Sequence, residues 1–382
     1  MENKKKVLFV ATITSHIKGF HEPYLKLLKE QGYKTYVVAK NNLKENEVIN
    51  YCDEFIELPI ERNPLKINNI IVIKKLKRII EREQIDLIHC HTPVGSVVAR
   101  LAAISARKKY GTRVIYTAHG FHFFKGAPLK NWIMFYPVEW YLSKYTDTLI
   151  TINHEDFNFA NSKFSKRCHD INYVPGVGID INKFKDKMSQ KEKREYKETL
   201  GLDENSFVLT CVARLDMNKN QGFLIDVIEK LVTKYNNIHL VLAGRDELNG
   251  YYQKIVKEKK LENNIHFLGN REDISELLSI SNIVLSASKR EGLPVNVMEA
   301  FANGKPVVAL KCRGMEDLLY NGENGFIVYS HDIDDFVDCI MKLYNYSDLY
   351  KKICKNNLAR IKNYDIKSIE KMLFDIYIQR WK

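Results

Sequence analysis

Short apolar segments rich in Val and Ile alternate with longer amphipathic segments along most of the chain. In the first half, the apolar segments predict strands at 6–12, 34–39, 86–90, 113–118 and 147–152. Patterns with the period of a helix, near 20–31, 68–83, 93–109 and 129–144, separate these strands. The alternation predicts a parallel sheet that is covered by helices on both faces.

The same alternation restarts after a polar, lysine-rich stretch that follows residue 180. Here it predicts strands at 206–213, 238–244, 265–269, 282–287 and 306–310, and helical segments at 331–362 and 365–381. Because Pro and Gly interrupt the pattern near 181, we place a domain boundary there. We therefore expect the α/β class with two Rossmann-like doubly wound domains facing across a cleft: an N-terminal domain, 1–181, a C-terminal domain, 182–363, and a terminal helix, 364–382, that returns to the N-terminal domain.

The amino-acid composition indicates a folded globular protein. The chain has 382 residues, of which 45% are hydrophobic and 28% charged. This is typical of a folded protein with large cores. No segment approaches the roughly 20 apolar residues of a spanning helix, and the apolar run near the start reads as a buried strand, not as a signal peptide. Seven scattered cysteines predict reduced thiols and a cytoplasmic location.

Basic residues are concentrated in the first half of the chain. The net charge is +12, and residues 1–180 hold 27 Lys and Arg against 18 Asp and Glu. A basic segment of this kind can bind nucleic acid, anionic lipid or a phosphorylated substrate. An ordinary lysine-rich surface without a ligand explains the excess of positive charge equally well. The chain has no zinc-finger, RNP, dinucleotide-fingerprint or P-loop motif, so we expect no nucleic-acid partner and no NAD.

Two polar loops follow predicted strands of the second half. After the strand at 282–287 come Glu291, Gly292 and Leu293, and a helix then carries Glu299. Backbone amides at the start of a helix favour phosphate, and a carboxylate beside a core needs hydrogen-bond donors such as sugar hydroxyls. An exposed Glu291 and a structurally paired Glu299 are the alternative.

After the strand at 206–213 come Arg214 and Lys219. A guanidinium and an ammonium together suit a diphosphate whose charge grows as it leaves, and they could do so without a metal. Because Lys and Arg are also common in surface loops, this spacing alone is weak evidence.

Histidines cluster at predicted strand ends of the first half, which holds 8 of the 11. Those at or just after strand ends are His16, His21, His91, His119 and His122. This clustering favours a polar pocket over isolated turn histidines. A zinc site would use His89, His91, His119 and His122, but no Cys or carboxylate lies at ligand spacing, so we expect no metal.

The segment 126–145 combines two tryptophans, three tyrosines and lysines. Such a mixture suits a membrane interface or a hydrophobic acceptor. A core helix is the more common origin of an aromatic stripe. One helix can serve both purposes, with half of its side chains in the core.

Together, these residues resemble the retaining nucleotide-sugar glycosyltransferases of family 4, which have the GT-B fold. The resemblance rests on the E-x7-E pair Glu291 and Glu299, on Arg214 and Lys219 in ARLDMNKNQ, and on His119 in YTAHGFHF. It extends over nearly the whole chain. The opening SHIKGFHEPYLKLLKEQGYKTYVV and the stretch HGFHFFKGAPLKNW look like the branch that builds bacterial capsular and exopolysaccharides.

The resemblance implies roles for the second-half residues. Arg214 and Lys219 would hold the donor diphosphate, and Glu299 would bind the ribose. Glu291 would bind the donor sugar, and the amides of Gly292 and Leu293 the distal phosphate.

It also implies that His119 sits by the reacting sugar and that a loop around Gly19 closes over the site. The segment around Arg271 would border the base. Two departures stand out: Gly19 is single where many relatives have a glycine pair, and Asn220 replaces the glycine that often follows the loop lysine.

The function so implied is transfer of a sugar from a UDP-sugar to a hydroxyl of a lipid-linked glycan acceptor, with retention of configuration, at the inner face of the membrane. An N-acetylhexosamine is the candidate sugar, and no cofactor or metal is expected. A UDP-sugar epimerase and a non-enzymatic membrane or carbohydrate-binding protein are the alternatives.

Overall fold

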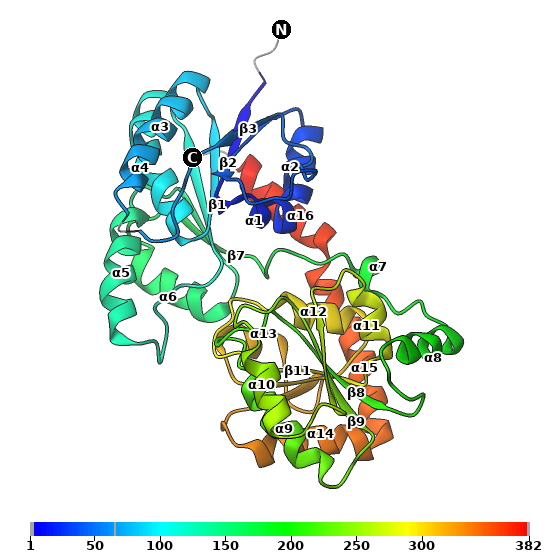
Figure 1. The fold of residues 1–382 in the computed structure, drawn as a ribbon. Coiled ribbons are helices and arrows are strands. Elements are labelled where there is room, and N and C mark those ends of the chain that lie inside the picture. The colour runs from blue at the N-terminus through cyan, green and yellow to red at the C-terminus, as the bar shows by residue number, and fades with distance from the viewer. Residues whose placement is uncertain (1–3, 65, 380–382) are drawn as a thin grey trace. The chain divides into compact units, whose positions relative to one another are not determined.

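The computed structural model describes residues 4–64 and 66–379, which form two compact units. Unit 1 consists of the described residues up to Val177 together with those from Lys367 onward, and unit 2 is Gly178–Ile366. The chain thus starts in unit 1, builds unit 2, and returns to unit 1 with its last helix (Figure 1).

Unit 1 is built on a parallel sheet in the strand order β3-β2-β1-β4-β5-β6-β7. Its strands are β1 (Lys6–Ile13), β2 (Lys34–Lys40), β3 (Glu54–Glu57), β4 (Leu87–His91), β5 (Arg113–Ala118), β6 (Thr148–Thr151) and β7 (Asp170–Tyr173). Its helices are α1 (Thr14–Phe20), α2 (Glu22–Glu30), α3 (Asn68–Glu83), α4 (Pro93–Tyr110), α5 (Leu129–Ser143), α6 (His154–Phe164) and α16 (Ile366–Ile378). The strand order changes direction between β1 and β4, where the crevice of a doubly wound sheet opens.

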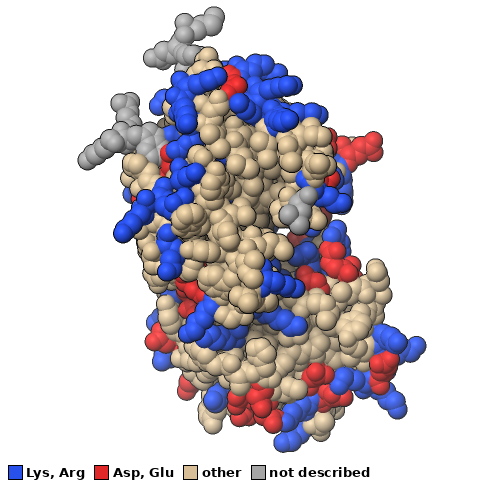
Figure 2. Space-filling model, turned by 90° about the vertical axis from the view of Figure 1, so that its left-hand side faces the viewer, with Lys and Arg blue, Asp and Glu red and all other residues tan. Residues whose placement is uncertain are grey.

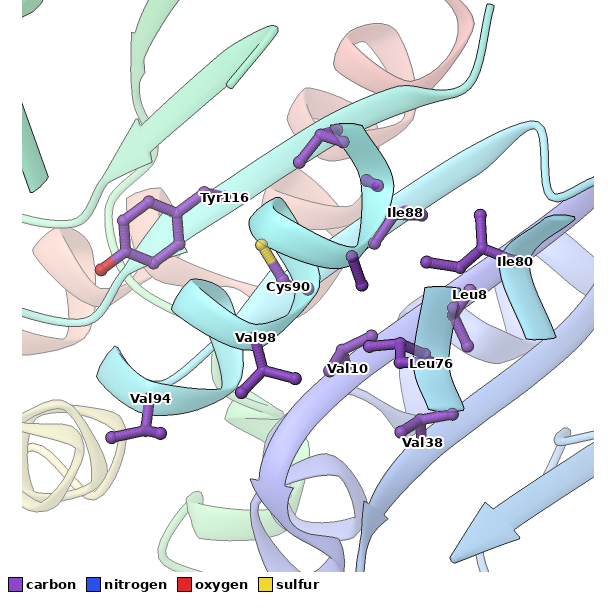
Figure 3. Packing of buried hydrophobic residues seen from close by; sticks show 14 of the residues in the cluster. Leu8, Val10, Val38, Leu76, Ile80, Ile88, Cys90, Val94, Val98 and Tyr116 are labelled. Carbon is purple, nitrogen blue, oxygen red and sulfur yellow. The ribbon is translucent and has the colours of Figure 1, made fainter. Parts of the chain in front are cut away.

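Helices α3, α4, α5 and α6 cover one face of this sheet. Figure 3 shows how Leu8 and Val10 of β1 pack between Leu76 of α3 and Val98 of α4 in the buried cluster. These side chains follow the alternation of a strand and the period of a helix, which is why the sequence pattern predicts both elements.

The opposite face of the same sheet is covered by α1, α2 and α16. Ile369, Leu373 and Tyr377 of α16 are buried with Val7 and Phe9 of β1. The terminal helix is therefore a structural part of the first sheet's core, as Figure 1 shows by its red ribbon among the blue elements.

Unit 2 contains a second parallel sheet in the order β10-β9-β8-β11-β12-β13. Its strands are β8 (Phe207–Val212), β9 (Ile238–Ala243), β10 (Ile265–Gly269), β11 (Ile283–Ser286), β12 (Val307–Leu310) and β13 (Gly325–Val328). Its helices are α7 (Ile181–Phe184), α8 (Gln190–Thr199), α9 (Gln221–Val232), α10 (Tyr251–Glu258), α11 (Ile274–Ile280), α12 (Val295–Ala302), α13 (Arg313–Leu318), α14 (Ile333–Asn345), α15 (Ser347–Arg360) and the 3-10 turn η1 (Ile361–Tyr364). Here the order changes direction between β8 and β11. The expected fold class is confirmed: α/β, with two Rossmann-like sheets.

Three strands of the structure were not predicted from the sequence pattern. β3 and β7 lie at the two edges of the first sheet and β13 at an edge of the second, and each has only four residues. β3 and β7 are partly exposed and lack the continuous apolar run that marks a central parallel strand, whereas β13 is mostly buried but very short.

Two helical predictions also change. The segment 331–362 is not one helix, because the chain breaks at Tyr346 between α14 and α15. The lysine-rich stretch after 186 contains α8, whose start is closed by a capping box between Ser189 and Glu192. Its side chains are too polar to show an apolar face, so only the cap marks it as a helix.

Candidate active site

In unit 2, a cation and a carboxylate meet where β8 and β11 end. Lys219 follows β8 and Glu291 follows β11, and Lys219 Nζ lies 2.6 Å from Glu291 Oε1. Both side chains are largely buried, with 18% and 14% of their surface exposed. These two loops thus meet at the point where the strand order reverses and where ligands of open α/β sheets bind.

Hydrogen bonds hold the two loops together. Asn218 Nδ2 donates to the carbonyl of Arg290, and the amide of Lys289 donates to the carbonyl of Asn218. Asp216 Oδ1 accepts the amides of Asn218 and Lys219, which fixes the turn that presents the lysine. The ammonium of Lys219 is therefore positioned by backbone contacts as well as by Glu291.

Asn220, which departs from the family pattern, has a left-handed backbone with φ of +57°. Asn is among the few residues with a side chain that adopt this conformation readily. The substitution for glycine therefore preserves the conformation with which the loop enters α9.

Arg214 is the more exposed of the two predicted cations. Its side chain is 59% exposed, and its guanidinium lies 3.5 Å from Asp216 Oδ2 and 3.9 Å from Glu247 Oε1. The side-chain amide of Gln221 donates from Nε2 to the carbonyl of Arg214, so the backbone is held while the Arg214 side chain faces solvent.

Gly292 and Leu293 precede α12, with Pro294 at the N-cap position instead of inside the first turn. A Cβ at Gly314 would lie 2.0 Å from the carbonyl oxygen of Gly292. Only glycine at 314 therefore allows the start of α13 to contact this backbone so closely.

Glu299 lies in α12, next to the buried Met298 and Ala300. Burial raises the pKa of its carboxyl group from 4.5 to about 7, although the nearby Lys183 ammonium opposes this shift. The alternative of an ordinary structural pair is not favoured, because a paired carboxylate would have a lowered pKa.

Arg271 lies two residues after the end of β10, and its side chain is paired with a neighbouring carboxylate. Its guanidinium binds both carboxylate oxygens of Asp273, and Nη2 donates to the hydroxyl of Tyr196 at 3.3 Å. This leaves the backbone around Arg271 as the part available to a ligand.

In unit 1, four histidines meet where β1, β4 and β5 end. The closest nitrogen pairs are His21 Nε2 to His16 Nε2 at 3.3 Å, His16 Nε2 to His119 Nε2 at 3.4 Å, and His119 Nε2 to His91 Nδ1 at 3.4 Å. Burial lowers the pKa of each, to about 4 for His16. These rings are therefore neutral at physiological pH and form an uncharged polar pocket.

The histidine set that we considered for zinc is wrong in two members. His89 uses both nitrogens elsewhere, with Nδ1 2.8 Å from the Tyr377 hydroxyl and Nε2 2.8 Å from the Thr117 hydroxyl. His122 packs against the ring of Phe135 instead. His89 and His91 lie two residues apart on β4, so alternation places both side chains on the same face of the sheet, and it does not say which nitrogens meet.

Gly19 is not in a loop, contrary to our expectation. It lies in the helix α1, and a Cβ added to it would contact nothing within 4 Å. The backbone at this position thus has no need for glycine, although the role implied by the family resemblance stays a prediction.

Sequence reasoning missed several residues of the unit 2 edge. Arg313 and Gly314 follow β12 and reach the loop of Gly292, and burial together with Arg313 lowers the pKa of Arg290. The rule that ligands bind after strand ends could have found them, since β12 was predicted. No sequence pattern marks Asn218 as a site residue, because its hydrogen bond to the carbonyl of Arg290 forms only when the two loops meet in the fold.

The aromatic helix α5 divides its side chains as predicted. Trp132, Phe135 and Tyr136 pack on the core, whereas Ile133 is 69% exposed. The exposed large apolar residues of this helix are Leu129, Ile133, Met134, Val138, Trp140 and Tyr141. Its acidic residue, Glu139, is buried in a pair with Arg100 at 2.8 Å. The outer face of α5 is thus apolar and carries no negative charge.

For residues 4–64 and 66–379, no helix has the length and apolar character required to cross a bilayer.

Comparisons with known proteins agree with this architecture. Residues 192–360 match the family "Glycosyl transferases group 1", and residues 6–153 match "Glycosyl transferase 4-like". EpsD of Bacillus subtilis (strain 168), a protein assigned as a glycosyltransferase, is 38% identical over 98% of this chain and 96% of its own.

An Escherichia coli enzyme, the UDP-Gal:alpha-D-GlcNAc-diphosphoundecaprenol alpha-1,3-galactosyltransferase, is 25% identical over 82% of each chain. The crystal structure of HepE of Anabaena with UDP and glucose superimposes with a TM-score of 0.76 at 20% identity, over 98% of this chain and 99% of that one. The resemblance seen in the sequence is confirmed, and the chain belongs to glycosyltransferase family 4 with the GT-B fold.

Proposed function

We propose that this glycosyltransferase moves a sugar from a UDP-sugar to a hydroxyl of a lipid-linked glycan acceptor, with retention of anomeric configuration, in the synthesis of a capsular or extracellular polysaccharide. The observation that carries the proposal is the pairing of Lys219 with Glu291 at the edge of the unit 2 sheet, beside the exposed Arg214. Membership of the family supplies the reaction class.

Lys219 and Arg214 bind the donor diphosphate. An ammonium has three N–H donors, so Lys219 can keep Glu291 and still donate to a phosphate oxygen. Arg214 is exposed, and its two carboxylate neighbours lie at 3.5 and 3.9 Å, so its guanidinium can turn to a phosphate at small cost. As the glycosidic bond breaks, negative charge grows on the diphosphate, and both cations stabilise it. This role needs no metal.

Carboxylates bind the hydroxyl groups of the donor. Glu291 is held by Lys219 at the end of β11 and accepts hydroxyls of the transferred sugar. Glu299 accepts the two ribose hydroxyls, which offset the desolvation that now raises its pKa. We assign the amides of Gly292 and Leu293 to the distal phosphate and the backbone around Arg271 to the base.

His119 is assigned to the reacting sugar. It directly follows β5, and its Nε2 faces the imidazoles of His16 and His91, which are neutral as well. A neutral imidazole can donate or accept one hydrogen bond to a sugar hydroxyl without attracting the diphosphate.

The outer face of α5 suits a membrane surface near a lipid-linked acceptor. Its exposed apolar residues lie beside Lys125, Lys130 and Lys144, all exposed. Figure 2 shows this side of unit 1, where Lys and Arg surround a broad area of uncharged residues. Apolar side chains inserted among lipid chains and lysines near anionic head groups both favour binding.

The donor is tested by thermal shift with a panel of nucleotide sugars, with UDP-N-acetylhexosamines first. A ligand at 100 times its dissociation constant stabilises a protein by about 2.7 kcal/mol. We expect UDP-sugars to raise the melting temperature of the wild type and not of Lys219→Ala. A panel in which no UDP-sugar has an effect would contradict the proposal.

Transfer is tested with a polyprenyl-diphosphate glycan acceptor and the donor so identified, and the anomeric configuration of the product is read by NMR. An epimerised donor formed without acceptor would instead support the epimerase. Binding of liposomes without binding of any nucleotide sugar would support a non-enzymatic protein.

Membrane contact is tested by sedimentation with vesicles that contain phosphatidylglycerol. Ile133→Asp places a charge on the outer face of α5 and should reduce binding. Val48→Asp is the matched control, because Val48 is 68% exposed in unit 1 but lies outside this face. Equal loss in both variants would contradict the assignment of α5.

A further inference from the structure

The four imidazoles of unit 1 come from segments that are far apart in the sequence. His16 belongs to α1, His21 lies between α1 and α2, His91 ends β4, and His119 follows β5. One nitrogen of each lies within 4.8 Å of the corresponding nitrogens of the other three. The sheet topology thus brings four metal-ligating groups to one point beside its switch in strand order.

Three of the six nitrogen separations match the edges of a metal tetrahedron, and the other three are within 4.8 Å. Zinc binds imidazole nitrogen at 2.0–2.1 Å, which for tetrahedral ligands gives nitrogen pairs about 3.3–3.4 Å apart. The three closest pairs measure 3.3, 3.4 and 3.4 Å. A direct N–H donor and its acceptor prefer about 2.7–3.2 Å, so these separations are long for hydrogen bonds. We propose that His16, His21, His91 and His119 form a binding site for a transition metal ion of the Zn²⁺ type.

The donor set selects the kind of ion. Four neutral imidazoles without a carboxylate suit Zn²⁺, Cu²⁺ or Ni²⁺ and not Mg²⁺ or Ca²⁺, which prefer oxygen ligands. His21 and His91 are almost completely buried, whereas His16 and His119 are partly exposed. An ion can therefore reach the site from the side of these two rings.

The end of β4 is held in a fixed conformation beside His91. Thr92 has φ of +62°, which a β-branched residue seldom adopts, and its hydroxyl donates to the carbonyl of His91 at 2.5 Å. The same hydroxyl contacts the hydroxyl of Thr12 at 2.7 Å and accepts its amide. Unusual backbone at a ligand cluster indicates that the surroundings impose the position of the ring.

Each of the two buried rings makes its polar contacts through one nitrogen only. His21 Nδ1 and His91 Nε2 are buried and have no hydrogen-bond partner among the described residues. These rings are therefore not placed by hydrogen bonds at their outer edges. The atoms that face the other rings, His21 Nε2 and His91 Nδ1, make the polar contacts.

The ring orientations differ within the cluster. The rings of His16 and His119 are perpendicular, at 88°, so their nitrogens can point to one centre. The rings of His21 and His91 are stacked, 3.7 Å apart and 22° from parallel. Because a metal lies close to the plane of each ligating ring, one of these two stacked rings must turn before all four nitrogens can bind one ion.

An ion at this site would compete with the role assigned to His119, a consequence that rests on the proposed function. Coordination takes the Nε2 lone pair of His119, so a bound ion removes this nitrogen from the sugar. We therefore expect Zn²⁺ to inhibit transfer and a chelator to restore it. The binding site itself does not depend on the nature of the enzymatic reaction.

The test uses the full chain, freed of metal by a chelator, and titrates it with Zn²⁺ in a calorimeter and with Co²⁺ in a spectrophotometer. We expect one tight ion per chain and, for Co²⁺, the intense visible bands of tetrahedral coordination without thiolate charge transfer. Loss of a hydrogen-bond partner to a metal ligand costs 10- to 100-fold in affinity, so His16→Gln should cost about 100-fold or more.

His239→Gln is the matched control. His239 and His266 form a second histidine pair in unit 2, with Nδ1 and Nε2 3.1 Å apart, but offer only two ligands. This variant should keep the tight ion. Equal Zn²⁺ affinity in the wild type and in His16→Gln, or loss of the tight ion in His239→Gln alone, would overturn the proposal.

His119→Gln provides a second variant, and circular dichroism confirms that each is folded. Binding of a UDP-sugar is measured in the same samples. Tight binding of Zn²⁺ without binding of a UDP-sugar would contradict the proposed function and support the metal site. Binding of a UDP-sugar without tight binding of Zn²⁺ would contradict the metal site and support the proposed function.

Discussion

Unit 1 and unit 2 both place polar residues at the carboxyl ends of the strands beside the switch in strand order. In unit 2 these residues are charged, with Lys219 paired to Glu291 and Arg214 exposed nearby. In unit 1 they are neutral imidazoles whose pKa values are lowered by burial. The same topology thus builds a charged edge that suits a diphosphate and an uncharged edge that suits hydroxyl groups or a metal ion.

The largest expected effect tests the charged edge. Lys219→Ala should lower kcat/KM for transfer by about 10²–10³-fold, because a preorganised group that stabilises the leaving charge is lost. It should also weaken UDP binding in calorimetry. Lys234→Ala, on the exposed surface of the same unit, is the control.

The contrast between the charged edge of unit 2 and the uncharged edge of unit 1 would be contradicted if His119→Ala weakens UDP binding as much as Lys219→Ala does. In that case the diphosphate would depend on the uncharged edge as well.

The second prediction tests how closely the unit 2 loops must pack. Gly314→Ala should lower the free energy of unfolding by about 1–3 kcal/mol, since the new Cβ would lie 2.0 Å from the Gly292 carbonyl oxygen. Gly222→Ala is a matched change in a helix, where the Cβ meets only Tyr252 at 3.4 Å. Chemical denaturation measures both. Similar stabilities would show that the backbone of Gly292 can move away.

The third prediction concerns the carboxyl group of Glu299, whose pKa is about 7. Ribose hydroxyls donate to the ionised carboxylate, which is the minor form below pH 7. Binding below pH 7 must therefore release a proton, and the dissociation constant of a UDP-sugar should rise about tenfold from pH 8 to pH 6. An intact UDP-sugar is used because its diphosphate diester does not titrate in this range.

Glu299→Gln removes the titrating group, so its affinity should be the same at both pH values. A wild-type affinity that does not change with pH, or one that rises as the pH falls, would exclude ribose binding by an ionised Glu299.

The smallest expected effect tests unit 1. Gly19→Ala should raise the free energy of unfolding by about 0.5–1 kcal/mol, because Gly19 is inside α1 and its Cβ would contact nothing within 4 Å. Thermal melting measures this change. If transfer falls sharply although stability rises, Gly19 has a role in the reaction that its conformation does not reveal.

Periodicity was sufficient to predict the central strands, because parallel strands buried on both faces consist of continuous apolar residues. It was not sufficient for the edge strands β3, β7 and β13, which have only four residues each, and β3 and β7 are also partly exposed. The break at Tyr346 has no Pro or Gly to mark it.

For the site, the rule that polar residues follow strand ends predicted Lys219, Glu291 and His119. This rule does not predict which residues of two different loops contact each other. Asn218 and Gly314 act through residues about 70 and 20 positions away, respectively, and no local pattern encodes such a distance.

The return of α16 to unit 1 has a consequence for biosynthesis. Ile369, Leu373 and Tyr377 complete a core that otherwise belongs to the first 177 residues. The ribosome therefore makes the start of this core first and its last piece nearly 200 residues later, while the intervening unit is continuous and can fold as soon as it emerges. Unit 1 is thus the first unit to be synthesised and the last to complete its core. A nascent chain that is truncated before α16 would leave one face of the unit 1 sheet apolar and uncovered, and chaperones could bind it.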